Sequence, residues 1–375
     1  MIDPESVSIF AERVESVVGA QKSELMRLRQ LVRPLRAATE RIKPRSTTAI
    51  SIVGMDGGNN QVEFDPFLVQ IVRVVDSSDE KHCLDVVSPQ TDLIALAAAQ
   101  FEVSGKPLTA LGRMMQLLGV RTLHELSKMI PSPPTQPKPS WISVYRELHE
   151  WAVLLDLVRN RRFPCDTVVL RDGWLRTKVF ATDLFRLYQA ELDKAIDAHF
   201  REQRRRILVA GVLKRSKVLQ KYRLPMMLEG VLRTAYPAYV KVPKSLQAEV
   251  FEWDEIVGAV SEGRTIADAE NMVAGEMYFA KFGARIHDPA WVVDLLRTQE
   301  GLASTTFGYL LADALEGFPR PFFPMSLQRA HEHAAIGGMD LELFQQSMSN
   351  AVRKTLGSES PVLDECELLE DALGA

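Results

Sequence analysis

Two aspartates that each follow a short apolar run are the strongest constraint on how this chain folds. The first run, residues 49–55, is followed by Asp56-Gly57, and the second, residues 167–171, is followed by Asp172-Gly173. Short runs that are rich in β-branched residues and closed by glycine are typical of buried strands. We therefore predict two strands that each end in a carboxylate, with a glycine that lets the backbone turn. An ordinary Asp-Gly turn is the alternative at each position.

The other apolar runs predict an α/β chain. Strands are expected at 48–55, 67–75 and 83–87, and their short polar connections favour an antiparallel meander. A helix at about 141–160, a strand at 167–171, a helix at about 181–204 and a strand at 207–213 follow. A strand, a helix and a strand in this order predict parallel pairing with a right-handed crossover. Further strands are expected at 276–282 and 291–296, and further helices at about 302–315, 325–335 and 340–355.

The N-terminal region predicts one long helix over about residues 5–42. Its apolar side chains form an interrupted heptad seam, made of Val14, Val18, Leu25, Leu28, Val32 and Leu35. Such a seam is covered either by the helix's own domain or by a dimer or partner chain. We therefore divide the chain into an N-terminal segment 1–45, a main domain 46–357 and an acidic tail 358–375. Within the main domain, residues 90–140 are expected to form an insertion or a lid, helical over 90–130, that ends in a proline-rich linker.

Composition limits the cellular setting. The net charge of −4 creates no global attraction for nucleic acid, so any such binding needs a local basic patch. The three cysteines, Cys83, Cys165 and Cys366, are far apart and match neither a disulfide framework nor a zinc knuckle. We see no signal peptide and no apolar stretch of membrane-spanning length. These features predict a soluble cytoplasmic protein that does not enter a membrane.

The order of elements resembles the ribonuclease H-like fold, whose nucleases bind divalent metal through carboxylates on the two strands and on the helix between them. Here that helix carries Glu147 and Glu150, three residues apart on one face. Hydrolysis of a phosphodiester needs an activated water and a stabilised leaving oxygen, and carboxylate-bound metal ions supply both. Oxygen ligands with one imidazole suit Mn²⁺, with Mg²⁺ as the alternative.

Five segments, in order, resemble the motifs of the NurA nuclease family. They are Asp56-Gly57-Gly58-Asn59, a helical glutamate, Asp172-Gly173-Trp174-Leu175, Gly211-Val212-Leu213-Lys214, and Phe323-Pro324-Met325-Ser326-Leu327 followed by Ala330-His331. Trp174 departs from the family pattern, which has a small residue there. The spacing of the helical glutamate from the second aspartate favours Glu150 over Glu147.

The resemblance implies a metal-dependent DNA exonuclease with 5′-to-3′ polarity and single-strand endonuclease activity. It implies a homodimer that works with a hexameric HerA-type translocase ATPase in DNA end processing or defence. Carried over residue by residue, it implies Asp56, Glu150, Asp172 and His331 as the catalytic and metal-binding set. His333 lies on a different helix face and is the less favoured ligand. The remaining histidines have no ligand-like spacing, and we assign them no role: His82, His124, His149, His199 and His287.

Substrate contacts are expected from Lys214, Arg215, Trp174 and Phe323. Lys214 would neutralise a phosphate, and the basic residues around it would form a phosphate-tracking edge: Arg204, Arg205, Arg206, Arg215 and Lys217. The two aromatic rings would stack on unpaired bases, or else belong to the core. A solvated basic surface is the alternative for the charged residues.

Two other functions remain open from the sequence. One is a non-catalytic subunit that docks an ATPase through the N-terminal helix, and the other is a ribonuclease H-like enzyme of RNA processing. The chain has no Gly-x-x-x-x-Gly-Lys-Ser/Thr sequence, so it is not itself a P-loop ATPase.

Overall fold

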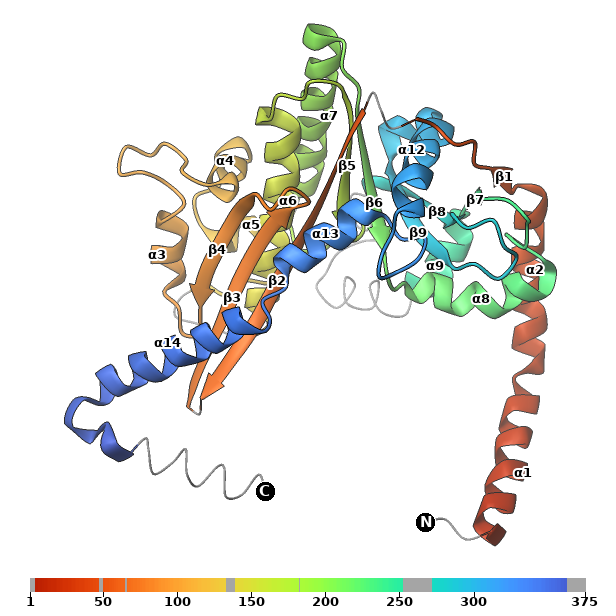
Figure 1. The fold of residues 1–375 in the computed structure, drawn as a ribbon, viewed down its shortest axis with the longest axis horizontal. Coiled ribbons are helices and arrows are strands. Elements are labelled where there is room, and N and C mark those ends of the chain that lie inside the picture. The colour runs from red at the N-terminus through yellow and green to blue at the C-terminus, as the bar shows by residue number, and fades with distance from the viewer. Residues whose placement is uncertain are drawn as a thin grey trace. The chain divides into compact units, whose positions relative to one another are not determined.

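Nine strands and many helices form a mixed α/β structure (Figure 1). This computed structural model describes residues 4–46, 50–64, 66–132, 139–181, 183–251 and 272–362. Most of the expected proline-rich linker and the end of the acidic tail lie outside the described residues. Hydrogen bonds join the strands in the order β1-β7-β8-β9-β6-β5-β2-β3-β4. The chain divides into two units, residues 1–55 with 157–329 and residues 56–156 with 330–375.

Two helices stand where the sequence predicted one. They are α1 (Pro4–Ala20) and α2 (Lys22–Ala37), and they separate at Gln21, the residue that interrupts the heptad seam. The seam is divided in the same way. Val32 and Leu35 on α2 are buried against α8 (Lys217–Glu229) in the first unit. Val14 and Val18 on α1 are 42% and 63% exposed. The helix's own unit therefore covers the seam on α2. For α1, cover by a dimer or partner chain remains the alternative.

The first unit is built on a sheet with helices on both faces. Its strands are β1 (Glu40–Arg41), β7 (Ala238–Lys241), β8 (Gly275–Lys281), β9 (Ala290–Leu296), β6 (Ile207–Leu213), β5 (Asp166–Asp172) and the first part of β2 (Ile50–Phe64). β5 and β6 pair parallel, as the sequence predicted. β2 also pairs parallel with β5, and β6 to β9 to β8 to β7 to β1 are antiparallel.

Alternate side chains of each strand pack on opposite faces of this sheet. Tyr278 joins the core under α12 (Ala303–Leu315) and the start of α13 (Met325–Ala334). Its neighbours Met277 and Phe279 join the core under α2 and α8. The remaining helices of this unit are α7 (Leu184–Gln203), α9 (Lys244–Phe251) and the 3₁₀ turn η2 (Arg297–Leu302). Because both faces are covered, β6 is buried at every position.

The second unit contains the predicted meander. Its strands are the rest of β2, β3 (Phe67–Asp76) and β4 (Lys81–Val87), and β3 pairs antiparallel with β4. Its helices are α3 (Leu93–Ala98), α4 (Ala110–Leu117), α5 (Leu123–Leu126), most of α6 (Trp141–Asn160), the end of α13 and α14 (Met339–Leu356), followed by the turn η3 (Gly357–Glu359). The described part of the expected insertion contains three short helices, α3, α4 and α5.

The predicted end of the first aspartate strand is wrong. β2 does not turn at Gly57 but continues to Phe64, so Asp56 lies inside a strand. The glycines serve close packing instead. A Cβ atom on Gly57 would lie 2.5 Å from Oε1 of Glu150, and one on Gly58 would lie 2.5 Å from the carbonyl oxygen of Ala334. Gly173 does follow the end of β5, and its φ of +146° is a conformation that favours glycine.

Among the helices of the described residues, none combines the length and apolar character needed to cross a bilayer.

Candidate active site

Asp56 and His331 meet within the second unit, although they are 275 residues apart in sequence. Asp56 is a buried residue of β2, and one of its oxygens, Oδ1, accepts a hydrogen bond of 2.8 Å from the Gly57 amide. Its other oxygen, Oδ2, lies 2.7 Å from Nδ1 of His331 on α13. The Gly57 amide therefore fixes the orientation of the Asp56 carboxylate. The His331 side chain is half exposed, so a ligand can approach this pair from the imidazole.

Glu150 lies against the same strand. It is a buried residue of α6, and its carboxylate occupies the space that a side chain at position 57 would need. Nε of Arg146, one turn earlier, lies 3.3 Å from Oε1 of Glu150. Arg146 also donates a hydrogen bond of 3.0 Å to Asn59 on β2. This arginine therefore fastens the glutamate-bearing turn of α6 to the strand that carries Asp56.

Glu147 has a different environment. Its Oε1 accepts a hydrogen bond of 3.3 Å from the indole of Trp151, one turn later on its own helix. The structure thus distinguishes the two helical glutamates, since only Glu150 is held against Gly57, next to Asp56.

Asp172 ends β5 in the first unit and pairs with a lysine. Nζ of Lys214 lies 2.5 Å from its Oδ2, and both side chains are largely buried. The register of the parallel strands pairs Met55 with Arg171 as their last partners. Asp56 and Asp172 are the residues that follow this pair on the two strands.

The loop after Asp172 is fixed by a buried ion pair that the sequence did not reveal. Arg176 donates two hydrogen bonds, of 3.0 and 2.8 Å, to the two oxygens of Asp294 on β9. The amide of Leu175 donates a third bond of 3.1 Å to the same carboxylate. Asp294 is 0% exposed and lies 118 residues from Arg176, so no local pattern links them. This carboxylate holds residues 175–176 in place immediately after the catalytic candidate.

The start of α13, the helix that carries His331, is also fixed by an aspartate. Asp313 on α12 accepts hydrogen bonds from the amide of Ser326 and, at 2.7 Å, from its hydroxyl. Burial raises the pKa of Asp313, and the bonds from Ser326 oppose that rise. The carboxylate satisfies a backbone donor of the first turn that would otherwise lack a partner.

Trp174 and Phe323 do not present free rings for base stacking. Phe323 is 0% exposed and packs on Trp291 in the core of the first unit, so the core alternative is the observed one. Nζ of Lys214 lies 5.6 Å from the centroid of its ring. Trp174 is half buried, and the guanidinium of Arg176 covers its ring at 5.2 Å. The Trp174 ring therefore packs against the Arg176 guanidinium, and the Phe323 ring lies near the Lys214 ammonium.

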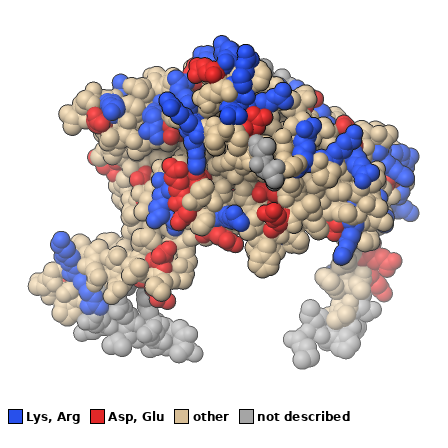
Figure 2. Space-filling model, turned by 45° about the horizontal axis from the view of Figure 1, so that its top comes forward, with Lys and Arg blue, Asp and Glu red and all other residues tan. Residues whose placement is uncertain are grey.

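The predicted basic edge is divided by β6. Arg204, Arg205 and Arg206 are exposed before the strand begins, whereas Lys214 and Arg215 come after it ends. A strand of seven residues spans about 20 Å at roughly 3.3 Å per residue. The stretch is therefore two separate groups rather than one continuous edge. Basic and acidic side chains lie beside one another over much of the face in Figure 2.

His333 faces away from His331. Its Nδ1 lies 3.6 Å from Oδ1 of Asp79, in the turn between β3 and β4. The two histidines of α13 thus have different acidic neighbours.

Comparison with known proteins gives structural likeness only. No family model matches the sequence, and no curated protein matches it. The crystal structure of the NurA nuclease from Sulfolobus solfataricus is 13% identical, covers 95% of this chain and 99% of its own, and has a TM-score of 0.46. Another NurA structure is 12% identical, covers 91% and 98%, and has a TM-score of 0.40. A NurA structure bound to dAMP and manganese is 10% identical, covers 94% and 99%, and has a TM-score of 0.39.

Proposed function

We propose that this protein is a metal-dependent DNA nuclease of the NurA type. The observation that carries the proposal is the contact of Asp56 on β2 with His331 on α13, beside Glu150 of α6, which packs on Gly57. The family motifs name the same three residues. Carboxylates and an imidazole, oriented here by the Gly57 amide and by Arg146, are donor types that a divalent cation takes.

The family resemblance adds Asp172, the last residue of β5, to this proposed centre. Three carboxylates and one imidazole suit Mn²⁺, with Mg²⁺ as the alternative. Such a metal would supply an activated water for attack on a phosphodiester.

Other residues of the chain would orient these ligands and contact the phosphate of the substrate. The Gly57 amide orients Asp56, and Arg146 keeps Glu150 against the strand. Lys214, which now pairs with Asp172, would turn its ammonium to the phosphate of the substrate. The exposed Arg215 next to it would extend this contact along the nucleic-acid backbone.

The strand arrangement supports a ribonuclease H-like core as part of this proposal. The support is the antiparallel β3–β4 pair and the parallel β5–β6 pair, which the sequence predicted, together with the parallel β2–β5 pair. Exonuclease action with 5′-to-3′ polarity, single-strand endonuclease action, a HerA-type ATPase partner and a homodimer remain proposals from the family resemblance. A cytoplasmic location and the division into segments 1–45, 46–357 and 358–375 remain proposals from the sequence.

Digestion of end-labelled single- and double-stranded DNA tests the proposal. Asp56→Asn and Asp172→Asn should each lower the cleavage rate by at least about 1,000-fold, because each removes a ligand of the reacting metal. Asp183→Asn, an exposed aspartate at the start of α7, is the control and should retain the wild-type rate. Cleavage in Mn²⁺ or Mg²⁺ should stop in EDTA. Undiminished cleavage in EDTA, or in both site variants, would refute the metal mechanism.

The same assay separates the two alternatives. Cleavage of RNA in preference to DNA would favour the RNA-processing enzyme. A folded wild-type protein that cleaves neither would favour the ATPase-docking subunit, for which the exposed apolar side chains of α1 provide a surface.

A further inference from the structure

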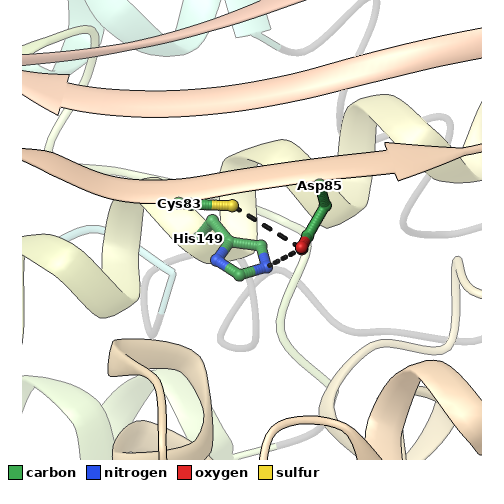
Figure 3. Close-up of side chains that lie close together, drawn as sticks. All are labelled: Cys83, Asp85 and His149. Atoms are coloured by element: carbon green, nitrogen blue, oxygen red, sulfur yellow. Dashed lines mark hydrogen bonds and ion pairs between the residues drawn. The ribbon is translucent and has the colours of Figure 1, made fainter.

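A second group of metal-binding side chains lies in the second unit, between β4 and α6 (Figure 3). Cys83 and Asp85 are two residues apart on β4, so they project from the same face of the strand. His149 projects toward them from α6. One ligand atom from each residue lies within 4.8 Å of the other two. We propose that Cys83, Asp85 and His149 bind one Zn²⁺ ion.

Two of the three distances match a tetrahedral site. Sγ of Cys83 lies 3.6 Å from Oδ2 of Asp85, and Nε2 of His149 lies 3.5 Å from the same oxygen. With bonds of about 2.3 Å to sulfur and about 2.0 Å to nitrogen and oxygen, tetrahedral ligand atoms lie about 3.3–3.5 Å apart. The third pair, Sγ and Nε2, lies within 4.8 Å, so small side-chain rotations would bring all three atoms to this spacing around a zinc ion.

His149 points to a ligand independently of these distances. The residue is 2% exposed, and its Nε2 has no hydrogen-bond partner. A buried polar atom without a partner is costly and needs an explanation. A metal ion between Nε2 and the carboxylate would satisfy both groups.

The surroundings of Asp85 resemble the outer shell of a metal site. The hydroxyl of Tyr145, one turn before His149, donates a hydrogen bond of 2.6 Å to Oδ2. Gln100 donates to that hydroxyl at 3.3 Å. A carboxylate oxygen has two lone pairs, so Oδ2 can keep the Tyr145 bond while it binds a metal. The Asp85 side chain is 32% exposed, which leaves access for the ion and for a water as fourth ligand.

The donor set distinguishes this site from the proposed active site. Sulfur, nitrogen and one carboxylate oxygen are typical of zinc, whereas the Asp56 region offers mainly oxygen and suits harder cations. A zinc ion here would join β4 to α6 at the residue next to Glu150. It would act as a structural clamp, independent of whether the protein is a nuclease.

Metal titration of the full chain tests the proposal. The Asp56→Asn/Asp172→Asn double variant serves as the background, so that binding at the proposed active site does not interfere. Co²⁺ should bind with one equivalent and give a thiolate-to-cobalt charge-transfer band in the near ultraviolet. Zn²⁺ should displace it, while excess Mg²⁺ should not. Cys83→Ser should lose the band, and Cys165→Ser, which changes the other free cysteine of the described residues, should keep it.

Two further measurements protect the test against a folding defect. Zn²⁺ should raise the Tm of the background protein and of Cys165→Ser, but not that of Cys83→Ser. Tyr145→Phe should keep the band and weaken Zn²⁺ affinity by about 10–100-fold, the usual effect of losing an outer-shell partner. A background protein with native circular dichroism but no cobalt band would overturn the proposal, as would a band that persists in Cys83→Ser.

Discussion

Glu147 and Glu150 show how one helical turn can separate two roles. Both lie on the face of α6 that the sequence singled out. The Glu150 carboxylate fills the space beside Gly57, while Glu147 accepts a hydrogen bond from Trp151 on its own helix. The choice of Glu150 over Glu147 as the metal ligand stays a prediction.

Replacing each glutamate by glutamine should separate the two positions. Glu150→Gln should lower single-turnover cleavage by about 100-fold or more, because a neutral amide is a poor ligand for a hard cation. Glu147→Gln should stay within a few-fold of wild type, since an amide oxygen can still accept the Trp151 bond. If Glu147→Gln lowered the cleavage rate more than Glu150→Gln, the metal ligand would be Glu147, one helical turn away.

At the scale of elements, the Arg176–Asp294 pair fixes the segment that follows β5. Asp294 has no exposure and receives three hydrogen bonds from residues 175–176. A buried pair of this kind contributes little compared with an apolar pair, but removing one partner leaves a buried charge.

Asp294→Ala should therefore lower the free energy of unfolding by about 3–5 kcal/mol. Urea unfolding followed by circular dichroism measures this value, and Asp183→Ala at the surface is the matched control. A loss below about 1 kcal/mol would mean that Arg176 finds another partner or water when Asp294 is removed.

The sequence predicted correctly those helices and strands whose own residues show a clear hydrophobic pattern. β3, β5, β6 and α6 appear within a few residues of their expected bounds, because each is a long apolar run or a clear helical repeat. The end of β2 was missed because Asp56-Gly57-Gly58 favours a turn locally, whereas contacts with α6 and α13 require an extended backbone without side chains.

Other features depended on distant partners and could not be predicted. The sequence did not predict α8, in which Pro225 interrupts the helical pattern, or β7, which has only four residues. It left Phe323 open between a base contact and the core, and only packing against Trp291 decides this. The motifs name Asp56, Glu150 and His331 as ligands, which stays a prediction, and they gave no sign of the group around Cys83. Those ligands follow no spacing rule, since strand geometry and a distant helix bring them together.

The two N-terminal helices differ in how their apolar side chains are covered. α2 is part of the first unit, where Leu28, Val32 and Leu35 pack on α8. α1 keeps a row of apolar side chains exposed, among them Val7, Ile9, Phe10, Val14, Val17 and Val18. A solvated helix does not need such a row, and this supports the proposal that α1 takes part in self-association or in docking of a partner chain.

Deletion of residues 1–20 should leave a folded protein with weaker self-association, as measured by light scattering after size exclusion. Deletion of residues 1–40 should also lose the buried side chains of α2, each worth about 1.5–3 kcal/mol, and should unfold or aggregate. If the shorter deletion already aggregates, α1 is covered by its own chain. An unchanged oligomeric state would instead direct the search for the partner surface to residues 90–140.

Three continuous elements cross the boundary between the two units. β2 passes it after Met55, α6 after Asp156 and α13 after Arg329. Each of these three elements continues from one unit into the other. Unfolding of one unit would therefore break backbone hydrogen bonds within an element that the other unit also needs. Melting should therefore be cooperative, and calorimetry should record one heat-absorption peak with equal calorimetric and van't Hoff enthalpies. Two resolved peaks would show that these elements can melt at the boundary and leave one unit intact.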